Sequence, residues 1–291
     1  MAKARSQFRE LLDMIKFEHT VFALPFAFLG ALAGAGGVPP LRTVLWILAA
    51  MVGARTAAMT WNRLVDADLD AANPRTAMRA IPAGRVSRLG ALLLLGAAIV
   101  LFGVAAGALN PLCWKLAPLA LAIILGYSLC KRFTPFAHLV LGLSLAGAPL
   151  GAWIAVRGQL EAPAWFLGAG VLFWTGGFDI LYALQDEAFD RSSGLHSIPA
   201  ALGTDGALVV SRLLHLAALS AWALFNLQMG SHLFGWLGWL GVALMLGREQ
   251  WLVRGGELGR IDEAFFTLNS LVGLVFFAGH LMEWWFARSV A

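Results

Sequence analysis

The chain has 291 residues, of which 59% are hydrophobic and 13% are charged, and its formal net charge is +4. Soluble domains are about 45–50% apolar with about a quarter of their residues charged, so a single water-facing globule is excluded. The apolar residues form long unbroken runs, which excludes a β-barrel, and the basic residues lie between the runs, which argues against nucleic-acid binding. We therefore expect an all-α polytopic membrane protein that forms one domain over residues 1–291.

The first segment, residues 1–18, mixes basic and acidic side chains with a few apolar ones. It contains no short apolar core followed by a small-residue cleavage site, so we do not interpret it as a cleaved signal. Phe8, Leu11, Leu12 and Ile15 fall at helical spacing. This spacing predicts an interfacial helix that lies along the membrane surface.

Nine apolar runs follow, separated by Gly, Pro and clusters of charge. Each run is a candidate transmembrane helix, because a span needs about 20 apolar residues. Two of the connections, 62–88 and 185–206, are longer than the roughly 12–15 residues beyond which loops are usually functional or disordered. We expect these two loops to carry the function. The nine candidate spans are 20–36, 41–61, 89–108, 112–130, 136–156, 164–184, 207–228, 232–247 and 264–286.

The distribution of Lys and Arg predicts the orientation, because cytoplasmic segments of membrane proteins carry an excess of these residues. With the N-terminus in the cytoplasm, sixteen of the 21 Lys and Arg residues fall in cytoplasmic segments. Four fall on the opposite side, and Arg55 lies inside the second span. We therefore expect a cytoplasmic N-terminus, with both long loops facing the cytoplasm.

Seven of the 17 acidic residues fall in two short windows. Residues four apart share a helix face, so Asn62, Asp66 and Asp70 are predicted to lie on one face, with Asp68 pointing away. In the second window Asp179, Asp186 and Asp190 have the spacing i, i+7 and i+11, again one face of a helix. The seven acidic residues are Asp66, Asp68, Asp70, Asp179, Asp186, Glu187 and Asp190.

The two windows resemble each other in a way that indicates a duplicated unit. The pairs Asp66/Asp70 and Asp186/Asp190 have the same internal spacing. Each pair is followed by the tripeptide Ile-Pro-Ala, at Ile81 and at Ile198. We expect two copies of a unit in which a span is followed by an acidic cytoplasmic loop.

Carboxylates gathered on one helix face repel each other and need a cation. Mg²⁺ is usually held by one or two carboxylates together with phosphate oxygens and water. Arg75, Arg79, Lys131 and Arg132 lie nearby in the sequence and could neutralise a phosphate group. The pattern favours a lipid-like diphosphate substrate. The alternatives are that the loop aspartates are merely solvated, or that Asp–Arg pairs hold helices together.

The two acidic motifs and the segments around them resemble those of the UbiA-type intramembrane prenyltransferases. The segment from Asn62 to Asp70, with Asn73-Pro-Arg75-Thr76 and Ile81-Pro82-Ala-Gly84, is similar to the first aspartate-rich motif of that family. The segment from Asp179 to Asp190, with Gly194-Leu-His-Ser197, is similar to the second. Tyr127-Ser-Leu-Cys-Lys131-Arg132 resembles the family's Tyr-x-x-x-Lys-Arg segment, and the opening His19-Thr20-Val-Phe-Ala-Leu-Pro25 is also similar. The resemblance is close over about residues 10–205.

The resemblance implies Mg²⁺-dependent transfer of a polyprenyl chain from polyprenyl diphosphate to an aromatic ring. The implied metal ligands are Asn62, Asp66, Asp70, Asp186 and Asp190, and the implied diphosphate-binding residues are Arg75, Lys131 and Arg132. Tyr127 could face an allylic cation through its ring. Arg55 is a candidate functional residue, because a charged side chain inside the membrane is energetically costly. The resemblance implies that it lies beside the aromatic acceptor. Asp179, grouped with Arg55 as an acceptor-binding residue, could pair with Arg55 or act as a base that removes the ring proton after attack.

Two departures from the family pattern occur, Arg63 after Asn62 and His196 in place of a Lys. The Asn62-Arg63 opening, the stretch from His19 to Pro25 and Gly194-Leu-His-Ser-Ile-Pro199 resemble a bacterial subgroup. That subgroup comprises 4-hydroxybenzoate polyprenyltransferases or naphthoate prenyltransferases, which in menaquinone synthesis use 1,4-dihydroxy-6-naphthoate. Both acceptors offer an electron-rich ring and a carboxylate. The implied partners are the prenyl diphosphate, a small aromatic acid and the bilayer of the inner (cytoplasmic) membrane, with no nucleic acid and no obligate protein partner.

Two other classes of protein compete with this interpretation. An ion-coupled transporter would explain a duplicated acidic motif, but its charges would lie near the middle of the membrane rather than at cytoplasmic helix ends. A CDP-alcohol phosphotransferase also uses Asp clusters and Mg²⁺, but it has far fewer spans and a Gly directly after its first Asp pair. Neither of these features is present in the sequence.

Overall fold

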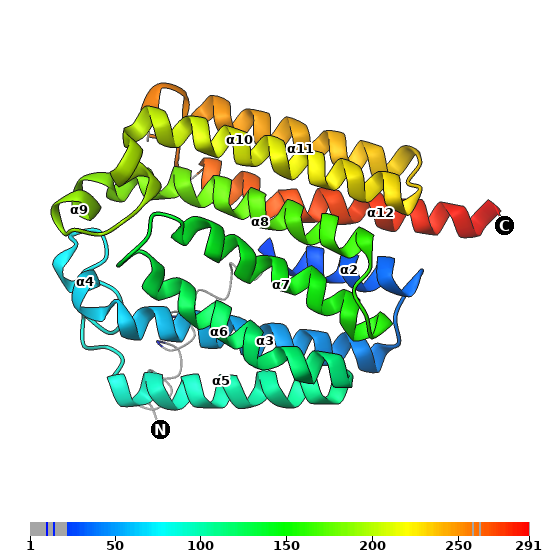
Figure 1. Cartoon of the computed structure of the whole chain (residues 1–291), viewed down its shortest axis with the longest axis horizontal. Coiled ribbons are helices and arrows are strands. Elements are labelled where there is room, and N and C mark those ends of the chain that lie inside the picture. The colour runs from blue at the N-terminus through cyan, green and yellow to red at the C-terminus, as the bar shows by residue number, and fades with distance from the viewer. Residues whose placement is uncertain (1–9, 11–13, 15–21, 258, 262, 291) are drawn as a thin grey trace. The chain divides into compact units, whose positions relative to one another are not determined.

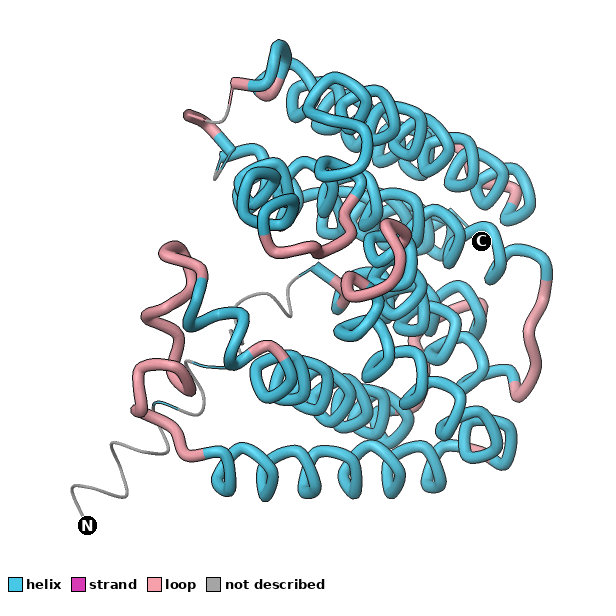
Figure 2. Tube along the Cα trace, turned by 60° about the vertical axis from the view of Figure 1, so that its left-hand side comes forward, coloured by secondary structure: helices cyan, strands magenta, loops and turns pink. Residues whose placement is uncertain are grey.

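The structure is a computed structural model that describes residues 10, 14, 22–257, 259–261 and 263–290. Within these residues all regular secondary structure is helical, as expected (Figure 1). Figure 2 shows the helices as cyan tubes joined by pink loops. The predicted interfacial helix over residues 1–18 lies almost entirely outside the described residues. The remaining chain divides into two compact units, which are described separately below.

The helices follow the nine apolar runs of the sequence, with two short helices added in the two long loops. The first apolar run is only partly helical, because α2 has 12 residues. The long helices are α2 (Leu24–Ala35), α3 (Leu41–Val65), α5 (Arg88–Leu109), α6 (Pro111–Cys130), α7 (Ala137–Arg157), α8 (Ala162–Ala183), α10 (Ile198–Met229), α11 (Leu233–Leu252) and α12 (Asn269–Val290). The short helices are α4 (Ala67–Ala72) and α9 (Glu187–Ser192).

Seven helices in the described part of the chain are long and apolar enough to cross a membrane. They are α3, α5, α6, α7, α8 with its short extension, α10 and α12. Of the nine runs that we predicted as spans, α2 is too short by this criterion and α11 is not among the seven. The chain is therefore a helical protein with several candidate transmembrane spans.

Unit 1 comprises Leu45–Leu129 together with Glu10 and Met14. Its long helices are most of α3, α5 and most of α6, and they pack through small residues. Ala57 on α3 contacts Leu95 and Ala98 on α5, and Leu125 of α6 packs against the same cluster. Gly53 lies so close to Ala98 and Phe102 that a Cβ there would be 2.7 Å from the Phe102 backbone nitrogen. Close packing through small residues is the usual way in which membrane helices associate.

Unit 2 comprises the described parts of Val21–Val44 and Cys130–Ala291. Its helices form a closed ring in the order α2, α7, α8, α10, α11 and α12, with α12 returning to α2. In Figure 1, α8 lies between α7 and α10. It is the most enclosed of the candidate spans. The second acidic motif begins at the C-terminal end of α8, so it is attached to the most buried of the candidate spans.

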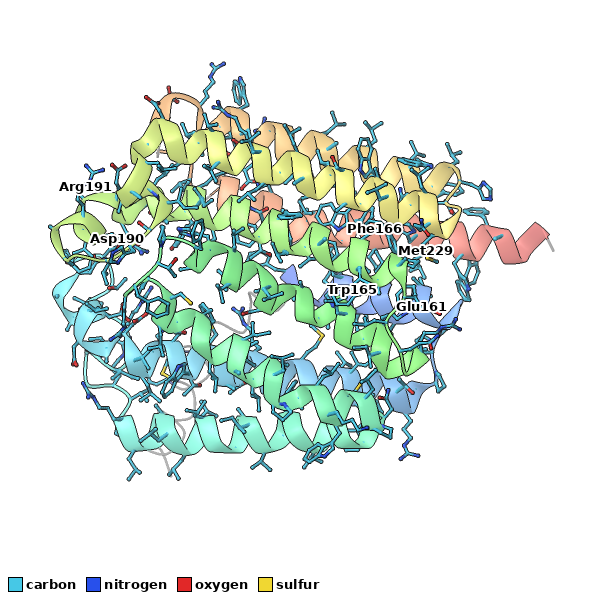
Figure 3. The ribbon with its side chains drawn as sticks, viewed as in Figure 1. Glu161, Trp165, Phe166, Asp190, Arg191 and Met229 are labelled. Atoms are coloured by element: carbon cyan, nitrogen blue, oxygen red, sulfur yellow. The ribbon has the colours of Figure 1, made fainter. Side chains whose placement is uncertain are left out.

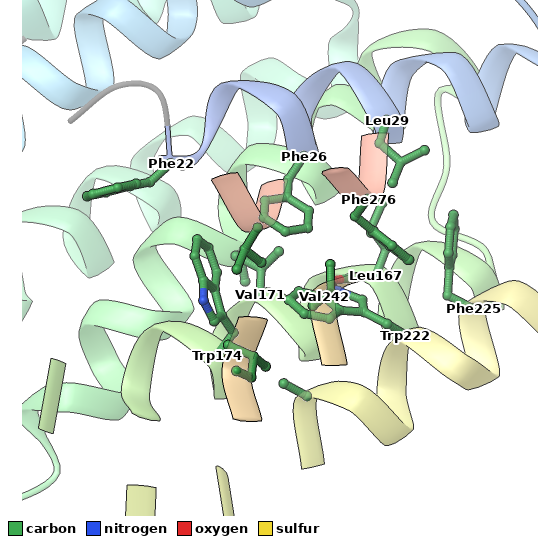
Figure 4. Close-up of a cluster of buried hydrophobic side chains, with 14 of the residues drawn as sticks. Phe22, Phe26, Leu29, Leu167, Val171, Trp174, Trp222, Phe225, Val242 and Phe276 are labelled. Carbon is green, nitrogen blue, oxygen red and sulfur yellow. The ribbon is translucent and has the colours of Figure 1, made fainter. Parts of the chain in front are cut away.

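The core of unit 2 is aromatic (Figure 4). The Phe26 ring stacks on Trp222 with ring centres 5.2 Å apart, and it also contacts Trp174 at 5.3 Å. Phe276 of α12 lies 5.3 Å from Trp222. Aromatic pairs at these separations contribute beyond their buried area. This cluster joins α2, α8, α10 and α12.

Glycines on α7 and α8 allow neighbouring groups to approach the backbone. A Cβ on Gly142 would collide with the backbone carbonyl of Leu172, which means that α7 and α8 meet almost backbone to backbone. Gly170 leaves room for the Trp222 indole, and Gly177 leaves room for the His215 ring. The aromatic core and the buried His215 both depend on this absence of side chains on α8.

A buried polar network crosses unit 2 next to the aromatic core. Trp174 Nε1 donates to Asn269 Oδ1 at 2.7 Å, and Asn269 Nδ2 donates to Glu249 Oε1 at 2.9 Å. On the other side, Ser211 donates to the Gly177 carbonyl at 2.8 Å. These bonds tie α8 to α10, α11 and α12, because each of them joins groups on different helices.

The structure corrects two expectations about the second long loop. The predicted loop 185–206 contains α9, and α10 begins at Ile198 rather than at 207. The interruption we expected before 207 is instead a kink inside α10 at Gly203, whose φ is 70°. The two Ile-Pro-Ala tripeptides also differ, because Ile81 lies in a turn whereas Ile198 opens a helix.

We predict that Gly142→Ala lowers the free energy of unfolding by about 1–3 kcal/mol, as overpacking in a tight interface does. The added methyl group would force α7 and α8 apart. Gly147→Ala on the same helix is the matched control, because a Cβ there meets nothing within 4 Å. Thermal unfolding of the two variants in detergent measures the difference. Equal melting temperatures would contradict the backbone-to-backbone packing of α7 and α8.

Candidate active site

The first acidic motif lies where α3 ends and α4 begins. Asp66 separates the two helices as the N-cap of α4, with φ −94° and ψ 2°. The backbone bonds from Asp66 N to Asn62 O (3.0 Å) and from Asp70 N to Asp66 O (2.7 Å) continue the i to i−4 pattern through the junction. The predicted shared face of Asn62, Asp66 and Asp70 is therefore kept.

Both carboxylates of this motif are buried, with Asp66 1% and Asp70 4% exposed. Asn62 Nδ2 donates to Asp66 Oδ2 at 3.0 Å, and Arg79 Nη1 pairs with Asp70 Oδ1 at 2.6 Å. The other oxygen of Asp70, Oδ2, is buried without a hydrogen-bond partner. A buried carboxylate oxygen in this state requires a cation or a donor. The oxygen donors of the motif fit a hard divalent cation such as Mg²⁺.

Asp68 lies apart from the motif, as its position in the sequence predicted. Its side chain is 90% exposed and forms an ion pair with Arg88 at 2.7 Å. Exposed ion pairs of this kind contribute little to stability. Asp68 is therefore a natural control residue for experiments on its neighbours.

Arg55 and Tyr127 both belong to unit 1. Tyr127 lies within electrostatic range of Arg55 and of Arg63. Arg55 is seven residues before Asn62 on the unbroken helix α3, so the two share a face. Arg63, the departure from the family pattern, donates to Asn62 Oδ1 at 3.2 Å. Asn62 Oδ1 is the oxygen that the sequence interpretation assigned to the metal, and an amide oxygen keeps a second lone pair beside such a bond.

The second acidic motif lies at the end of α8 in unit 2. A single 3₁₀ turn, Leu184–Asp186, separates α8 from α9. The shared helix face expected for Asp179, Asp186 and Asp190 assumed a continuous helix, and this turn interrupts it. Asp186 is the N-cap of α9, with φ −103° and ψ 1°. In Figure 3, Asp190 and Arg191 lie at one end of the helices of this unit, whereas the opposite end carries Glu161, Trp165, Phe166 and Met229.

The two motifs have the same local form. In each, the first Asp is the N-cap of a six-residue helix and the second Asp is the fourth residue of that helix. Neither Asp66 nor Asp186 caps its helix with its side chain, although Asp is a favoured capping residue. A glycine with positive φ follows each motif, Gly84 at 71° and Gly194 at 68°. The duplication seen in the sequence is therefore shared by the two short helices and their N-caps, whereas the segments that lead into and out of them differ.

Several polar groups surround Asp190, whose carboxyl is half-buried. It is hydrogen-bonded to Ser197, and Asp186, Lys131 and His138 are within electrostatic range. The backbone N–H of His196 donates to the Lys131 carbonyl at 2.7 Å. This bond holds the segment that leaves α9 against the segment that leaves α6, and so keeps Lys131 near the acidic motif.

The remaining basic residues of the sequence prediction lie at the surface of their own units. Arg75 is exposed in the turn after α4, where its backbone N–H donates to Asn73 Oδ1 at 2.9 Å. Arg132 is exposed in the turn after α6. Exposed guanidinium groups at these points are accessible to a charged ligand.

Each motif by itself provides two carboxylates. Among the described residues no group of three or more His, Cys, Asp or Glu side chains converges as a metal site. Magnesium does not need such a group, because it is commonly bound by one or two carboxylates and completed by substrate phosphate and water. The arrangement is thus typical of a metal–diphosphate site and differs from a closed structural metal site.

Comparison with known proteins agrees with this chemistry. The sequence matches the UbiA prenyltransferase family over residues 23–271, which includes both acidic motifs. The chain belongs to the UbiA prenyltransferase family. It is therefore a prenyltransferase, and its apolar helices make it a multi-pass membrane protein. The match also includes helices α10 and α11, where the sequence resemblance rested on hydropathy alone.

Two relatives show how similar the chain is to other members of the UbiA family. A 4-hydroxybenzoate octaprenyltransferase from Idiomarina loihiensis is 34% identical over 266 residues, with 88% of this chain and 89% of the relative covered. A 4-hydroxybenzoate octaprenyltransferase from Neisseria meningitidis is 29% identical over 255 residues, with 87% and 84% covered. The similarity extends along nearly the whole of each protein.

Solved structures of UbiA homologues share the fold. The apo structure of a homologue from Aeropyrum pernix K1 has a TM-score of 0.84 at 36% identity, covering 91% of this chain and 98% of that one. A homologue from Archaeoglobus fulgidus bound to DMAPP and Mg²⁺ has a TM-score of 0.72 at 18% identity, with 94% and 98% covered. The second similarity supports the fold alone.

The contact between His138 and Asp179 in this UbiA-family site was not predicted from the sequence. Asp179, considered as a partner of Arg55 or of the acceptor, accepts a short bond from His138, with 2.7 Å between Asp179 Oδ2 and His138 Nδ1. The two residues are 41 positions apart, on different helices. His138 stands alone at the start of an apolar helix, and no spacing rule connects it to Asp179.

Proposed function

We propose that this protein catalyses the Mg²⁺-dependent transfer of a polyprenyl chain from polyprenyl diphosphate to the ring of a small aromatic hydroxy acid of the 4-hydroxybenzoate type. The observation that carries the proposal is the pair of acidic motifs with the same backbone form, each with an Asp N-cap whose side chain does not cap its helix. The names of the relatives support the choice of acceptor and donor. The catalytic domain spans residues 1–291.

Asn62, Asp66 and Asp70 in the first motif, and Asp186 and Asp190 in the second, are the proposed ligands of Mg²⁺. The unpartnered Asp70 Oδ2 supports this role in the first motif. When bound, Mg²⁺ neutralises the charge that develops on the diphosphate leaving group. Arg79 already pairs with the other Asp70 oxygen, so it positions that carboxylate.

Arg75, Lys131 and Arg132 are the proposed diphosphate-binding residues, through charge-assisted hydrogen bonds. Lys131 lies within electrostatic range of Asp190, which supports a position beside the metal ligands. Tyr127 presents its ring to the allylic cation that forms when the bond to the diphosphate breaks. The apolar helices keep water away from this cation, which water would quench.

Arg55 and Asp179 are the proposed acceptor-binding residues. A charged side chain at the depth of Arg55 is costly in a membrane and is retained for function by default. Its guanidinium suits the carboxylate of an aromatic acid. Asp179 is 25% exposed while its Oδ2 is bonded to His138, so it is held in place and still accessible. The other candidate acceptor, 1,4-dihydroxy-6-naphthoate, has the same carboxylate and is an outcome of the assay below.

The proposed topology has nine spans, a cytoplasmic N-terminus and an active site on the cytoplasmic side of the inner membrane. The excess of Lys and Arg in the segments assigned to the cytoplasm supports this orientation. Two of the nine proposed spans have weaker support: α2 has only 12 residues, and α11 is not among the seven candidates. We propose that contacts with neighbouring helices hold both of them in the membrane. Both helices pack in the closed ring of unit 2.

We expect purified protein with Mg²⁺ and octaprenyl diphosphate to prenylate 4-hydroxybenzoate. Asp66→Ala and Asp186→Ala should each reduce kcat on the order of a thousandfold, because each removes a metal ligand worth several kcal/mol. Asp68→Ala and Asp205→Ala, at exposed positions, are the matched controls and should retain activity. Product formed only from 1,4-dihydroxy-6-naphthoate would identify that acid, rather than 4-hydroxybenzoate, as the acceptor. Product that survives both substitutions would overturn the metal site.

Mg²⁺ should stabilise the protein against thermal unfolding only when a diphosphate is also present. A ligand at a hundred times its Kd adds about 2.7 kcal/mol of stability, which thermal unfolding in detergent detects readily. Inorganic pyrophosphate is the probe, and Asp66→Ala should lose the effect while Asp68→Ala keeps it. Stabilisation by an ion without diphosphate would instead indicate ion-coupled transport.

Arg55→Ala should raise the KM for the aromatic acid by about tenfold or more, because it removes a charge-assisted hydrogen bond. The KM for the prenyl donor should change less than about twofold, since the loss concerns the acceptor alone. Arg42→Ala is the matched control, at an exposed position near the start of the same helix. Equal effects on both KM values would rule out acceptor binding by Arg55.

A further inference from the structure

His138 joins two parts of unit 2 that are far apart in the sequence. It is the second residue of α7 and is only 4% exposed. Its Nδ1 lies 2.7 Å from Asp179 Oδ2 on α8, and its Nε2 accepts the backbone N–H of Ile198, the first residue of α10, at 3.4 Å. Both ring nitrogens are therefore used, one by each neighbouring helix.

The two bonds fix the tautomer of the ring. A backbone N–H can only donate, so Nε2 must be the acceptor and cannot carry a proton. Nδ1 then carries the proton and donates it to the Asp179 carboxylate. In this arrangement the His138 ring has a defined direction, because it donates to Asp179 and accepts from Ile198. A protonated His138 would lose the bond to Ile198.

The bond to Ile198 reaches the second acidic motif. Ser197, the residue before Ile198, caps α10 and is hydrogen-bonded to Asp190. One residue earlier, His196 N donates to the Lys131 carbonyl. The segment from Lys131 to His138 therefore holds the exit of the motif at two points, once through backbone and once through the imidazole.

We infer that His138 is a positioning residue of the active site, which orients the Asp179 carboxylate towards the acceptor and whose ring is itself held by the bond from Ile198. The inference rests on the proposed function, because Asp179 is assigned there to acceptor binding. A carboxylate with one oxygen bonded to a buried donor has a fixed direction, and its exposed part keeps that direction when the substrate binds. Active sites commonly hold their contact residues through such outer hydrogen bonds.

The chemistry of the two bonds selects the test variants. Gln can replace both functions of this tautomer, because its amide donates through nitrogen and accepts through oxygen. Leu removes both functions while retaining an apolar side chain. His215→Leu is the matched control, since His215 is also buried in unit 2 and its ring is hydrogen-bonded, at 3.0 Å, to Gln250 of α11 rather than to Asp179.

The experiment measures kcat and the KM of both substrates for His138→Gln, His138→Leu, Asp179→Ala and the double variant His138→Leu/Asp179→Ala. We expect His138→Leu to raise the acceptor KM by about tenfold, the typical effect of losing one bond to a charged group. The donor KM should stay within about twofold, and His138→Gln should stay close to the wild type. The double variant should be no worse than Asp179→Ala, because His138 acts through Asp179. His215→Leu should lower the melting temperature without changing either KM.

The outcomes separate the inference from the proposed function. If the wild type is active and His138→Leu keeps its acceptor KM, or if the two substitutions have additive effects, the positioning role is overturned and the proposed function stands. If the wild type is inactive with both aromatic acids, the proposed function fails and the inference fails with it. If His138→Leu does not fold, His138→Asn replaces it, because the shorter amide cannot reach both Asp179 and Ile198.

Discussion

The interruption of a helix at an aspartate is the constraint on which both halves of this site depend. The long helix α3 ends at Val65 and α8 ends at Ala183, and after each a six-residue helix begins with Asp66 or Asp186 as its N-cap. In an ordinary N-cap the carboxylate would accept a backbone N–H of its own helix. Here neither side chain does so. The junction therefore places a carboxylate between two helices without a side-chain bond that caps the second helix.

Burial then determines what such a carboxylate can bind. Asp66 and Asp70 are almost fully enclosed, and Arg79 compensates only one oxygen of Asp70. Buried anions are costly unless paired, so the remaining oxygen favours a cation over water alone. In the second motif Asp190 is half-buried and has Ser197 and Lys131 around it, which is an environment more open to a charged ligand. The two copies share a backbone form but differ in how much charge the chain itself neutralises.

Close packing of α7, α8 and α10 holds the second motif in place. Gly142 brings α7 against α8, and Gly177 makes space on α8 for His215. These close approaches enclose α8, which carries Asp179 towards its C-terminal end. His138 then connects α7, α8 and the start of α10 through one ring. Small residues allow membrane helices to approach, and buried hydrogen bonds fix how they are aligned.

The sequence by itself determined the helical class, the nine apolar runs and the two acidic motifs, because hydropathy and the i, i+4 spacing are local properties. It also indicated the duplication and the separation of Asp68 from its neighbours. Tertiary structure decided the pairing of Asp179 with His138, the ion pair of Arg79 with Asp70 and the start of α10 at Ile198. These features join residues through space or depend on what an element packs against. Local sequence patterns do not predict these contacts, because only folding brings residues that are distant in the sequence together.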